Sequence, residues 1–321
     1  MFLRSLALVL VLVTAVGAAW AQRFEFVALG DLPYGSDSQA GAPYRALIGS
    51  INREKPAFSV HVGDIKSGGS VCSNEEFARQ RGHFDLFYGA VMYTPGDNEW
   101  TDCHRASNGS YEPVERLQAL RRLFFSPGRS LGQRPLKVEN QSSLMPSHGS
   151  YIENQRWMHQ GVLFVTLHVV GSNNNLDPSR PATVAEYEAR DRANLAWLQD
   201  AFALARAQGA RALVVAMQAD PLGPLNVSGV VGPSSGFAQI VGRTLLPLSR
   251  EAPFPVLLIH GDSHTFRFDR PFMLQGHPLP QLMRLQVPGD RDVRAVAVQV
   301  DLDQSMPFSV RLLEPVTAAR P

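Results

Sequence analysis

Four short apolar runs in this chain each stop at a Gly-Asp pair. The pairs are Gly30-Asp31, Gly63-Asp64, Gly96-Asp97 and Gly261-Asp262. Runs of Val, Leu, Ile and Phe bounded by turn residues are typical of buried strands. Helical patterns at 43–53 and 75–88 separate the first three runs, which indicates βαβ units in an α/β fold. Because ligands bind at the carboxyl ends of strands in such sheets, we expect the four aspartates to converge there.

Four carboxylates in one cleft repel one another strongly. A single Gly-Asp pair would indicate no more than a turn, but four at strand ends need a common explanation. Either several of the carboxyl groups stay protonated with raised pKa values, or cations neutralise them. Two divalent ions would match the charge. The pattern therefore predicts a metal site.

The second half of the chain also contains patterns that predict strands and a helix. We expect a strand at 161–170, a helix at 186–208, a strand at 212–217, and a C-terminal hairpin from alternating apolar residues at 296–302 and 308–313. The run Asn173-Asn174-Asn175 is expected to form a turn, and its alternative is an uncharged loop that faces the substrate.

The N-terminus carries Arg4 and then a largely apolar run that closes on Ala19-Trp20-Ala21. This is the pattern of a secretory signal, with an uncleaved membrane anchor as the alternative. We therefore expect a signal peptide at 1–21, a single domain at 22–321, and a secreted or periplasmic protein that leaves the membrane after cleavage.

The charge of the chain is balanced. Of 30 Lys and Arg residues only Arg4 lies in the signal, which leaves 29 to match the 29 Asp and Glu residues. A net charge of zero argues against a nucleic-acid partner held by bulk charge. The oligomeric state cannot be deduced from this pattern.

The chain has two cysteines, Cys72 and Cys103. In an exported protein an even count predicts a disulfide, and two free buried thiols are the alternative.

At this point the residues resemble the calcineurin-like metallophosphoesterase family, in order, from Gly30 to about Leu313. Asp31 stands at the family's first Asp ligand, and Asp64 at the Asp that bridges two metals. The remaining blocks are Gly96-Asp97-Asn98-Glu99 for Gly-Asn-His-Asp/Glu, Met217-Gln218-Ala219-Asp220-Pro221 for the fourth block, and Gly261-Asp262-Ser263-His264 for Gly-His-x-His. The resemblance implies a four-layer αββα sandwich of two mixed β-sheets flanked by helices. It also implies a metal-dependent phosphoester hydrolase that acts on a phosphorylated small molecule.

The ligand set departs from the family pattern. Pro33, Asn98 and Gln218 replace histidines, Asp97 replaces the Asn ligand, and Asp262 replaces another histidine. The implied first metal would be held by Asp31, Asp64 and His264, and the second by Asp64, Asp97, Gln218 and Asp262. Oxygen ligands favour Mg²⁺, Mn²⁺ or Ca²⁺ over Zn²⁺, with Fe possible.

The expected catalytic residues are Asp64, Asn98 and His104. Asp64 would bridge the ions, and Asn98 could donate a hydrogen bond to the phosphate but cannot protonate a leaving group. His104 is our candidate for that acid, and its alternative is an ordinary exposed loop residue. Tyr34, Lys66 and Arg267 are candidate phosphate contacts from neighbouring loops, and the alternative for each is a structural or solvated residue.

Two other functions stay open. The protein could be a catalytically inactive binding protein that keeps the fold and holds a structural Ca²⁺. It could also be a serine hydrolase built on Ser263, with His264 or His260 as base. In such hydrolases, however, a Gly-Asp-Ser nucleophile motif normally lies at the start of the domain, whereas here Gly261-Asp262-Ser263 lies near the end of the chain.

Overall fold

The computed structural model of the protein describes residues 23–223 and 228–316. The predicted signal peptide at 1–21 lies outside these residues, so it stays a prediction, as does the single domain at 22–321. Across the described part of the chain, no helix combines the length and the apolar character needed to cross a membrane.

The first sheet contains five strands in the order β14-β13-β1-β2-β3. Strands β1, β2 and β3 are parallel neighbours joined through α1 and α2, which confirms the predicted βαβ units. The bounds are β1 Arg23–Leu29, α1 Ala42–Glu54, β2 Ser59–His61, α2 Asn74–Phe84, β3 Val91–Tyr93, β13 Ala295–Asp301 and β14 Phe308–Leu313.

The second sheet contains seven strands in the order β4-β5-β6-β7-β8-β12-β9. Its centre is parallel and its edges are antiparallel, so it is a mixed sheet. The strands are β4 Glu139–Asn140, β5 Gln155–His159, β6 Val162–Thr166, β7 Ala212–Ala216, β8 Val256–His260, β9 Arg267–Asp269 and β12 Leu282–Gln286, and a separate pair is formed by β10 Met273–Leu274 and β11 His277–Pro278.

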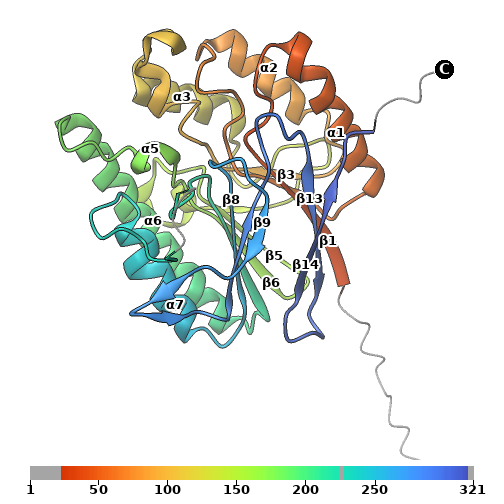
Figure 1. Ribbon diagram of the computed structural model, residues 1–321, viewed down its shortest axis with the longest axis vertical. Helices are drawn as coiled ribbons and strands as arrows, with labels where there is room; N and C mark the ends of the chain where they lie inside the picture. Colours follow the sequence, from red (N-terminus) through yellow and green to blue (C-terminus); the bar gives the residue numbers. More distant parts are fainter. Residues whose placement is uncertain (1–22, 224–227, 317–321) are drawn as a thin grey trace, which may run out of the picture.

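The two sheets pack face to face between two helical layers. Along β8, Leu257 and Ile259 join the core between the sheets, whereas Val256 and Leu258 join the core beneath the outer helices. Successive side chains of a strand point to opposite faces, so a sheet covered on both sides is apolar throughout. Figure 1 shows α1, α2 and α3 on one side of the molecule and α6 and α7 on the other. The four-layer αββα sandwich is confirmed.

The helices and short turns complete the chain. They are η1 Asp37–Gly41, η2 Thr101–His104, η3 Ala106–Asn108, α3 Pro113–Phe124, α4 Gln141–Leu144, η4 Pro146–His148, α5 Gly171–Asn174, α6 Pro181–Ala207, η5 Ala238–Leu245 and α7 Leu246–Glu251. The C-terminal hairpin is confirmed as β13 and β14.

Several expected bounds differ from the structure. The helix expected at 186–208 begins at Pro181, which lies in its first turn, and the strand expected at 161–170 ends at Thr166. Helix α2 ends at Phe84 instead of residue 88, because Asn52 on α1 accepts a hydrogen bond from the Tyr88 backbone N–H (2.9 Å) and the chain turns toward β3. Helix α3 was not expected, although its start carries the ordinary signals: Pro113 in the first turn and the Glu112 side chain capping it.

A disulfide joins Cys72 and Cys103, as predicted, with Cα atoms 5.8 Å apart. Both sulfur atoms lie near the backbone oxygen of Asn98, at 3.6 and 3.8 Å. The same oxygen accepts a hydrogen bond from the buried ammonium of Lys66 (2.6 Å). The loops that follow β2 and β3 are therefore tied together at Asn98.

A fully buried carboxylate, Glu153, lies before β5. It accepts hydrogen bonds from Arg121 at 3.0 and 2.5 Å, and it lies 2.8 Å from Nδ1 of His168. Burial alone would raise the pKa of Glu153, but the guanidinium of Arg121 and the ring of His168 outweigh burial and lower this pKa to about 2.

We expect loss of the disulfide to destabilise the fold. The bond closes a loop between positions 31 residues apart, which corresponds to about 3 to 4 kcal/mol on the chain-entropy model. Urea unfolding of a Cys72→Ala/Cys103→Ala variant should show that loss. Reductant should weaken the wild type and leave the variant unchanged; equal sensitivity of both to reductant would contradict the assignment.

Glu153 should make the protein sensitive to acid. Its folded pKa of about 2 lies below the ordinary value of 4.5, so its stabilisation is present above pH 4.5 and is lost as pH falls toward 2. Glu153→Gln should lower the free energy of unfolding at neutral pH by about 3 to 5 kcal/mol, because a buried ion pair is broken. It should also flatten the acid limb of the stability curve.

The matched control is Glu139→Gln. Glu139 pairs with Arg156, but its side chain is 52% exposed, so we expect a change below about 1 kcal/mol. Similar losses in both variants would show that burial of Glu153 is not the cause.

Candidate metal centre

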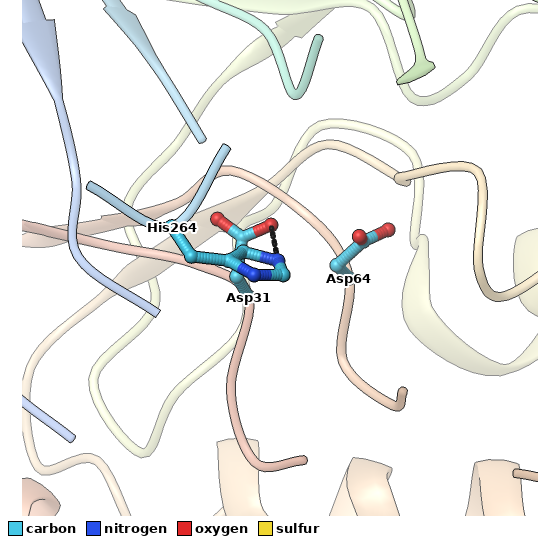
Figure 2. A group of neighbouring side chains, drawn as sticks. All are labelled: Asp31, Asp64 and His264. Carbon is cyan, nitrogen blue, oxygen red and sulfur yellow. Dashed lines mark ion pairs between the residues drawn. The ribbon is translucent and has the colours of Figure 1, made fainter. Parts of the chain in front are cut away.

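Three predicted ligands of the first metal, Asp31, Asp64 and His264, lie together. They follow β1, β2 and β8, and each offers one ligand atom within 4.8 Å of the others. Figure 2 shows the His264 ring against the Asp31 carboxylate, with Asp64 entering from a neighbouring loop. The Nε2 atom of His264 lies 3.5 Å from Oδ1 of Asp31. Both aspartates are buried and the histidine is 34% exposed, so the group opens to solvent on one side.

The backbone reverses sharply where these side chains leave their strands. Asp31, Asp64, Asp262 and His264 have φ values of 52°, 51°, 74° and 56°. This left-handed region is unfavourable for residues other than Gly, although Asp tolerates it better than most. Such strain gathers at functional sites, where the surrounding structure holds it in place.

The Asp31 carboxylate is fixed by the loop after β8. Both of its oxygens accept the backbone N–H of Asp262, at 3.0 and 3.2 Å. A Cβ on Gly261 would lie 2.0 Å from Oδ2 of Asp31, so a side chain at this position would displace the Asp31 carboxylate. Burial raises the pKa of Asp31, and His264 acts in the opposite direction.

The Asp64 carboxylate is held by Tyr34 and Asn98. Its Oδ2 accepts the Tyr34 hydroxyl and the Asn98 side-chain amide, both at 2.7 Å. The pKa of Asp64 is raised well above its ordinary value, first by burial and then by the negative charges of Asp97 and Glu99. Burial and Asp64 also raise the pKa of Tyr34, whose ring meets His264 edge to face.

The predicted second-metal residues lie beside this group. One oxygen each of Asp97 and Asp262 lies within 2.7 Å of the point that a Cβ on Gly171 would occupy. Oδ1 of Asp97 is buried without a hydrogen-bond partner in the described structure. Burial, and to a lesser extent the negative charge of Asp97, raises the pKa of Asp262 to about 8.

Gln218 occupies the back of this second group. Its amide oxygen accepts the backbone N–H of Gly171, and its buried amide nitrogen has no partner among residues 23–223 and 228–316. The donor set as a whole fits divalent cations, because it gathers several carboxylate oxygens whose negative charges repel one another.

Two residues of the centre had no role assigned to them from the sequence, although Glu99 was part of a recognised block. The Ser172 hydroxyl lies 2.8 Å from Asp97 Oδ2 and 3.1 Å from Asp102 Oδ1. Glu99 accepts the backbone N–H groups of Asp64 and Gly96 and so shapes the turn after β3. Asn173-Asn174-Asn175, which directly follow Ser172, had been considered as a loop that faces the substrate. Nothing in the sequence, however, shows that Ser172 faces Asp97.

The remaining predicted residues lie farther out. His104 is exposed at the end of η2, with Nδ1 2.7 Å from the Thr101 backbone oxygen. Arg267 begins β9, is partly buried and pairs with Gln286 across the sheet. Their roles stay predictions.

The serine hydrolase alternative gains no support from this geometry. The Ser263 hydroxyl donates to Asp220 (2.7 Å), and His264 faces Asp31. The segment 232–236 does match Gly-x-Ser-x-Gly, but it lies in a turn that follows residues 228–231 and leads into η5, not between a strand and a helix as a nucleophile elbow requires.

A cavity of about 940 Å³ lies elsewhere, near Lys55 and Gly89, which precede β2 and β3. This is the amino end of those strands, whereas the aspartates follow their carboxyl ends. We therefore assign the chemistry to the carboxylate group despite the size of the other cavity.

Solved structures of metallophosphoesterases share this architecture, although no protein-family model and no curated protein matches the chain. GAP50, the anchor in the inner membrane complex of Plasmodium, aligns with a TM-score of 0.50 at 12% identity over 92% of this chain and 90% of its own. Purple acid phosphatase PPD1 from yellow lupin (Lupinus luteus) seeds aligns with a TM-score of 0.52 at 13% identity, over 92% of this chain and 54% of its own. A dimetal phosphatase from Danio rerio aligns with a TM-score of 0.50 at 11% identity, over 91% of this chain and 99% of its own. Such low identities demonstrate the fold alone, and the chain therefore has the metallophosphoesterase fold that its Gly-Asp blocks resemble.

Proposed function

We propose that the chain is a metal-dependent phosphoester hydrolase that acts outside the cytoplasm on a phosphorylated small molecule. The observation that carries this proposal is the crowding of buried carboxylates beside His264 at the strand ends of a phosphatase fold. Without counter-charge such a group is unfavourable, and divalent cations supply it.

Two ions fit the donor set. The first would be held by Asp31, Asp64 and His264, and the second by Asp64, Asp97, Gln218 and Asp262. When bound, the ions would offset phosphoryl charge and make water acidic. The predominance of oxygen donors favours Mg²⁺, Mn²⁺ or Ca²⁺ over Zn²⁺, with Fe as a further candidate.

The chain's own residues would position the phosphate and move the proton. The Asn98 amide nitrogen contacts both Asp64 and Tyr34 at 2.7 Å, so it can donate to a phosphoryl oxygen by turning one N–H away from Tyr34. His104 is the proposed proton donor to the leaving group, a role that contributes typically about 10² to 10⁴-fold. Arg267 is proposed to contact the phosphate from the periphery of the site.

The location outside the cytoplasm rests on two observations. The Cys72–Cys103 disulfide is of a kind that persists in oxidising compartments. The sequence from Arg4 to Ala21 has the pattern of a secretory signal.

A second candidate function is an inactive binding protein that holds Ca²⁺. The replacement of histidines by Pro33, Asn98, Gln218 and Asp262 favours it, because catalysis in the family uses several of these imidazoles. GAP50 shares the fold and is described as an anchor. An oxygen-rich site suits the millimolar Ca²⁺ found outside cells.

Metal-dependent turnover separates the two functions. We expect the wild type to hydrolyse p-nitrophenyl phosphate or bis-p-nitrophenyl phosphate after addition of Mg²⁺, Mn²⁺ or Ca²⁺. Asp64→Ala should lose at least about 100-fold in turnover, because even loss of a partner that only orients a metal ligand costs about 10- to 100-fold. Asp303→Ala is the control, because Asp303 is 53% exposed on the distant hairpin. Bound metal by elemental analysis without turnover would instead favour the binding protein.

Gly261→Ala should abolish metal binding without removing a ligand, because the new Cβ would lie 2.0 Å from Asp31 Oδ2. Saturating Mn²⁺ or Ca²⁺ should raise the wild-type melting temperature. At a metal concentration of one hundred times Kd, binding stabilises the folded state by about 2.7 kcal/mol. The variant should show no rise.

Gly82→Ala is the matched control. Gly82 lies in α2 with nothing within 4 Å of its Cβ position, so this variant should keep the metal response. A metal-dependent rise retained in Gly261→Ala would contradict the placement of Asp31 in the ligand set.

A further inference from the structure

A small pocket adjoins the carboxylate group on the side of Asp97. Its volume is about 160 Å³, and its walls come from segments 101–105 and 172–180. Ser172 belongs to this wall, and its hydroxyl lies 2.8 Å from Asp97 Oδ2. Ser172 is therefore shared between the pocket and the surroundings of Asp97, which places the pocket beside the proposed metal centre.

Every side chain in the wall can form hydrogen bonds. Arg105 pairs with the buried Asp102 at 2.6 Å and lies 3.5 Å from the Ser172 hydroxyl. On the other side Arg180 pairs with Asp177 at 2.7 Å. A guanidinium has five N–H donors, so each arginine keeps donors beyond those its partner uses. The walls thus offer paired donors and acceptors with their charges already balanced.

The wall is held in place from behind. The fully buried Arg190 on α6 donates to the backbone oxygens of His168 (3.0 Å) and Asn174 (2.9 Å), at the two ends of the turn that carries Ser172. Asn175 is fixed by Glu186 at 2.8 Å. A loop tied at both ends loses little freedom when a ligand binds, which favours selective recognition.

We propose that this pocket binds the hydroxyl-bearing part of the substrate, so that the substrates are phosphoesters of a polyol or a sugar. This inference rests on the proposed hydrolase function. A neutral group with several hydroxyls can use the donors and acceptors together. A second phosphate or carboxylate would meet Asp102 and Asp177, and an aryl group would find no apolar wall and would leave polar atoms unpaired.

The pocket also fits the proton balance of hydrolysis. The ester P–O bond breaks, the oxygen of water forms the new P–O bond, and one proton reaches the departing alkoxide, which becomes the polyol hydroxyl. An alkoxide leaves poorly without that proton, and His104 is part of the same wall. A polyol ester would therefore depend on this wall for both binding and protonation.

The first test compares substrate preference in Arg180→Leu and Arg105→Leu. We measure kcat/KM for glycerol 2-phosphate and for phenyl phosphate, and we expect the ratio of the two to fall at least about tenfold in each variant, mainly through KM for the glycerol ester. Arg180 is 43% exposed and its partner is exposed too, so its loss leaves no buried charge.

Arg192→Leu is the control, because Arg192 is 65% exposed on α6 and pairs only loosely with Glu188. Its ratio should equal that of the wild type. An unchanged ratio in both pocket variants would overturn the assignment of the pocket.

The second test does not depend on turnover. Saturation-transfer NMR with glycerol and myo-inositol should show binding to the wild type and a loss of signal in Arg180→Leu. Polyol binding without hydrolysis of any ester would overturn the proposed hydrolase and keep the pocket. Hydrolysis without polyol binding or polyol preference would overturn the pocket and keep the hydrolase.

Discussion

Mutual repulsion among buried carboxylates is the constraint around which this molecule is organised. Asp31, Asp64 and Asp262 have raised pKa values because water is excluded and because like charges face one another. A fold can keep such a group only if its backbone holds the side chains in place. Here tight turns in the left-handed region and close approaches at Gly171 and Gly261 do so.

The layers of the fold serve that arrangement. Parallel strands buried on both faces leave their carboxyl ends as the place where polar side chains can gather. The disulfide ties the loops after β2 and β3 at Asn98, which in turn contacts Asp64. On the opposite wall, Arg190 holds the turn that brings Ser172 to Asp97. The two sheets therefore contribute one half of the centre each.

Function depends on how far the altered ligand set still resembles that of an enzyme. In the proposed metal centre, carboxylate and amide oxygens in place of imidazoles would favour hard cations, and Asn98 cannot supply a proton. The polar pocket beside Asp97 is linked to the carboxylate group through Ser172, and its wall of balanced ion pairs would suit hydroxyl groups. The two proposals can therefore be tested separately, because the carboxylate group and the pocket are lined by different residues.

The sequence by itself determined the strands that end at Asp31, Asp64, Asp97 and Asp262, the disulfide, the C-terminal hairpin and the resemblance to the phosphoesterase blocks. Apart from the disulfide, which followed from the even cysteine count, these features are local, because they depend on the apolar period of a strand or on the residue types at a turn. Tertiary structure decided which oxygens face one another, that Ser172 and Glu99 belong to the centre, and that Arg105 and Arg180 line one pocket. Those contacts join segments up to 231 residues apart in the chain, and their geometry follows from the packing of two sheets, which no local pattern specifies.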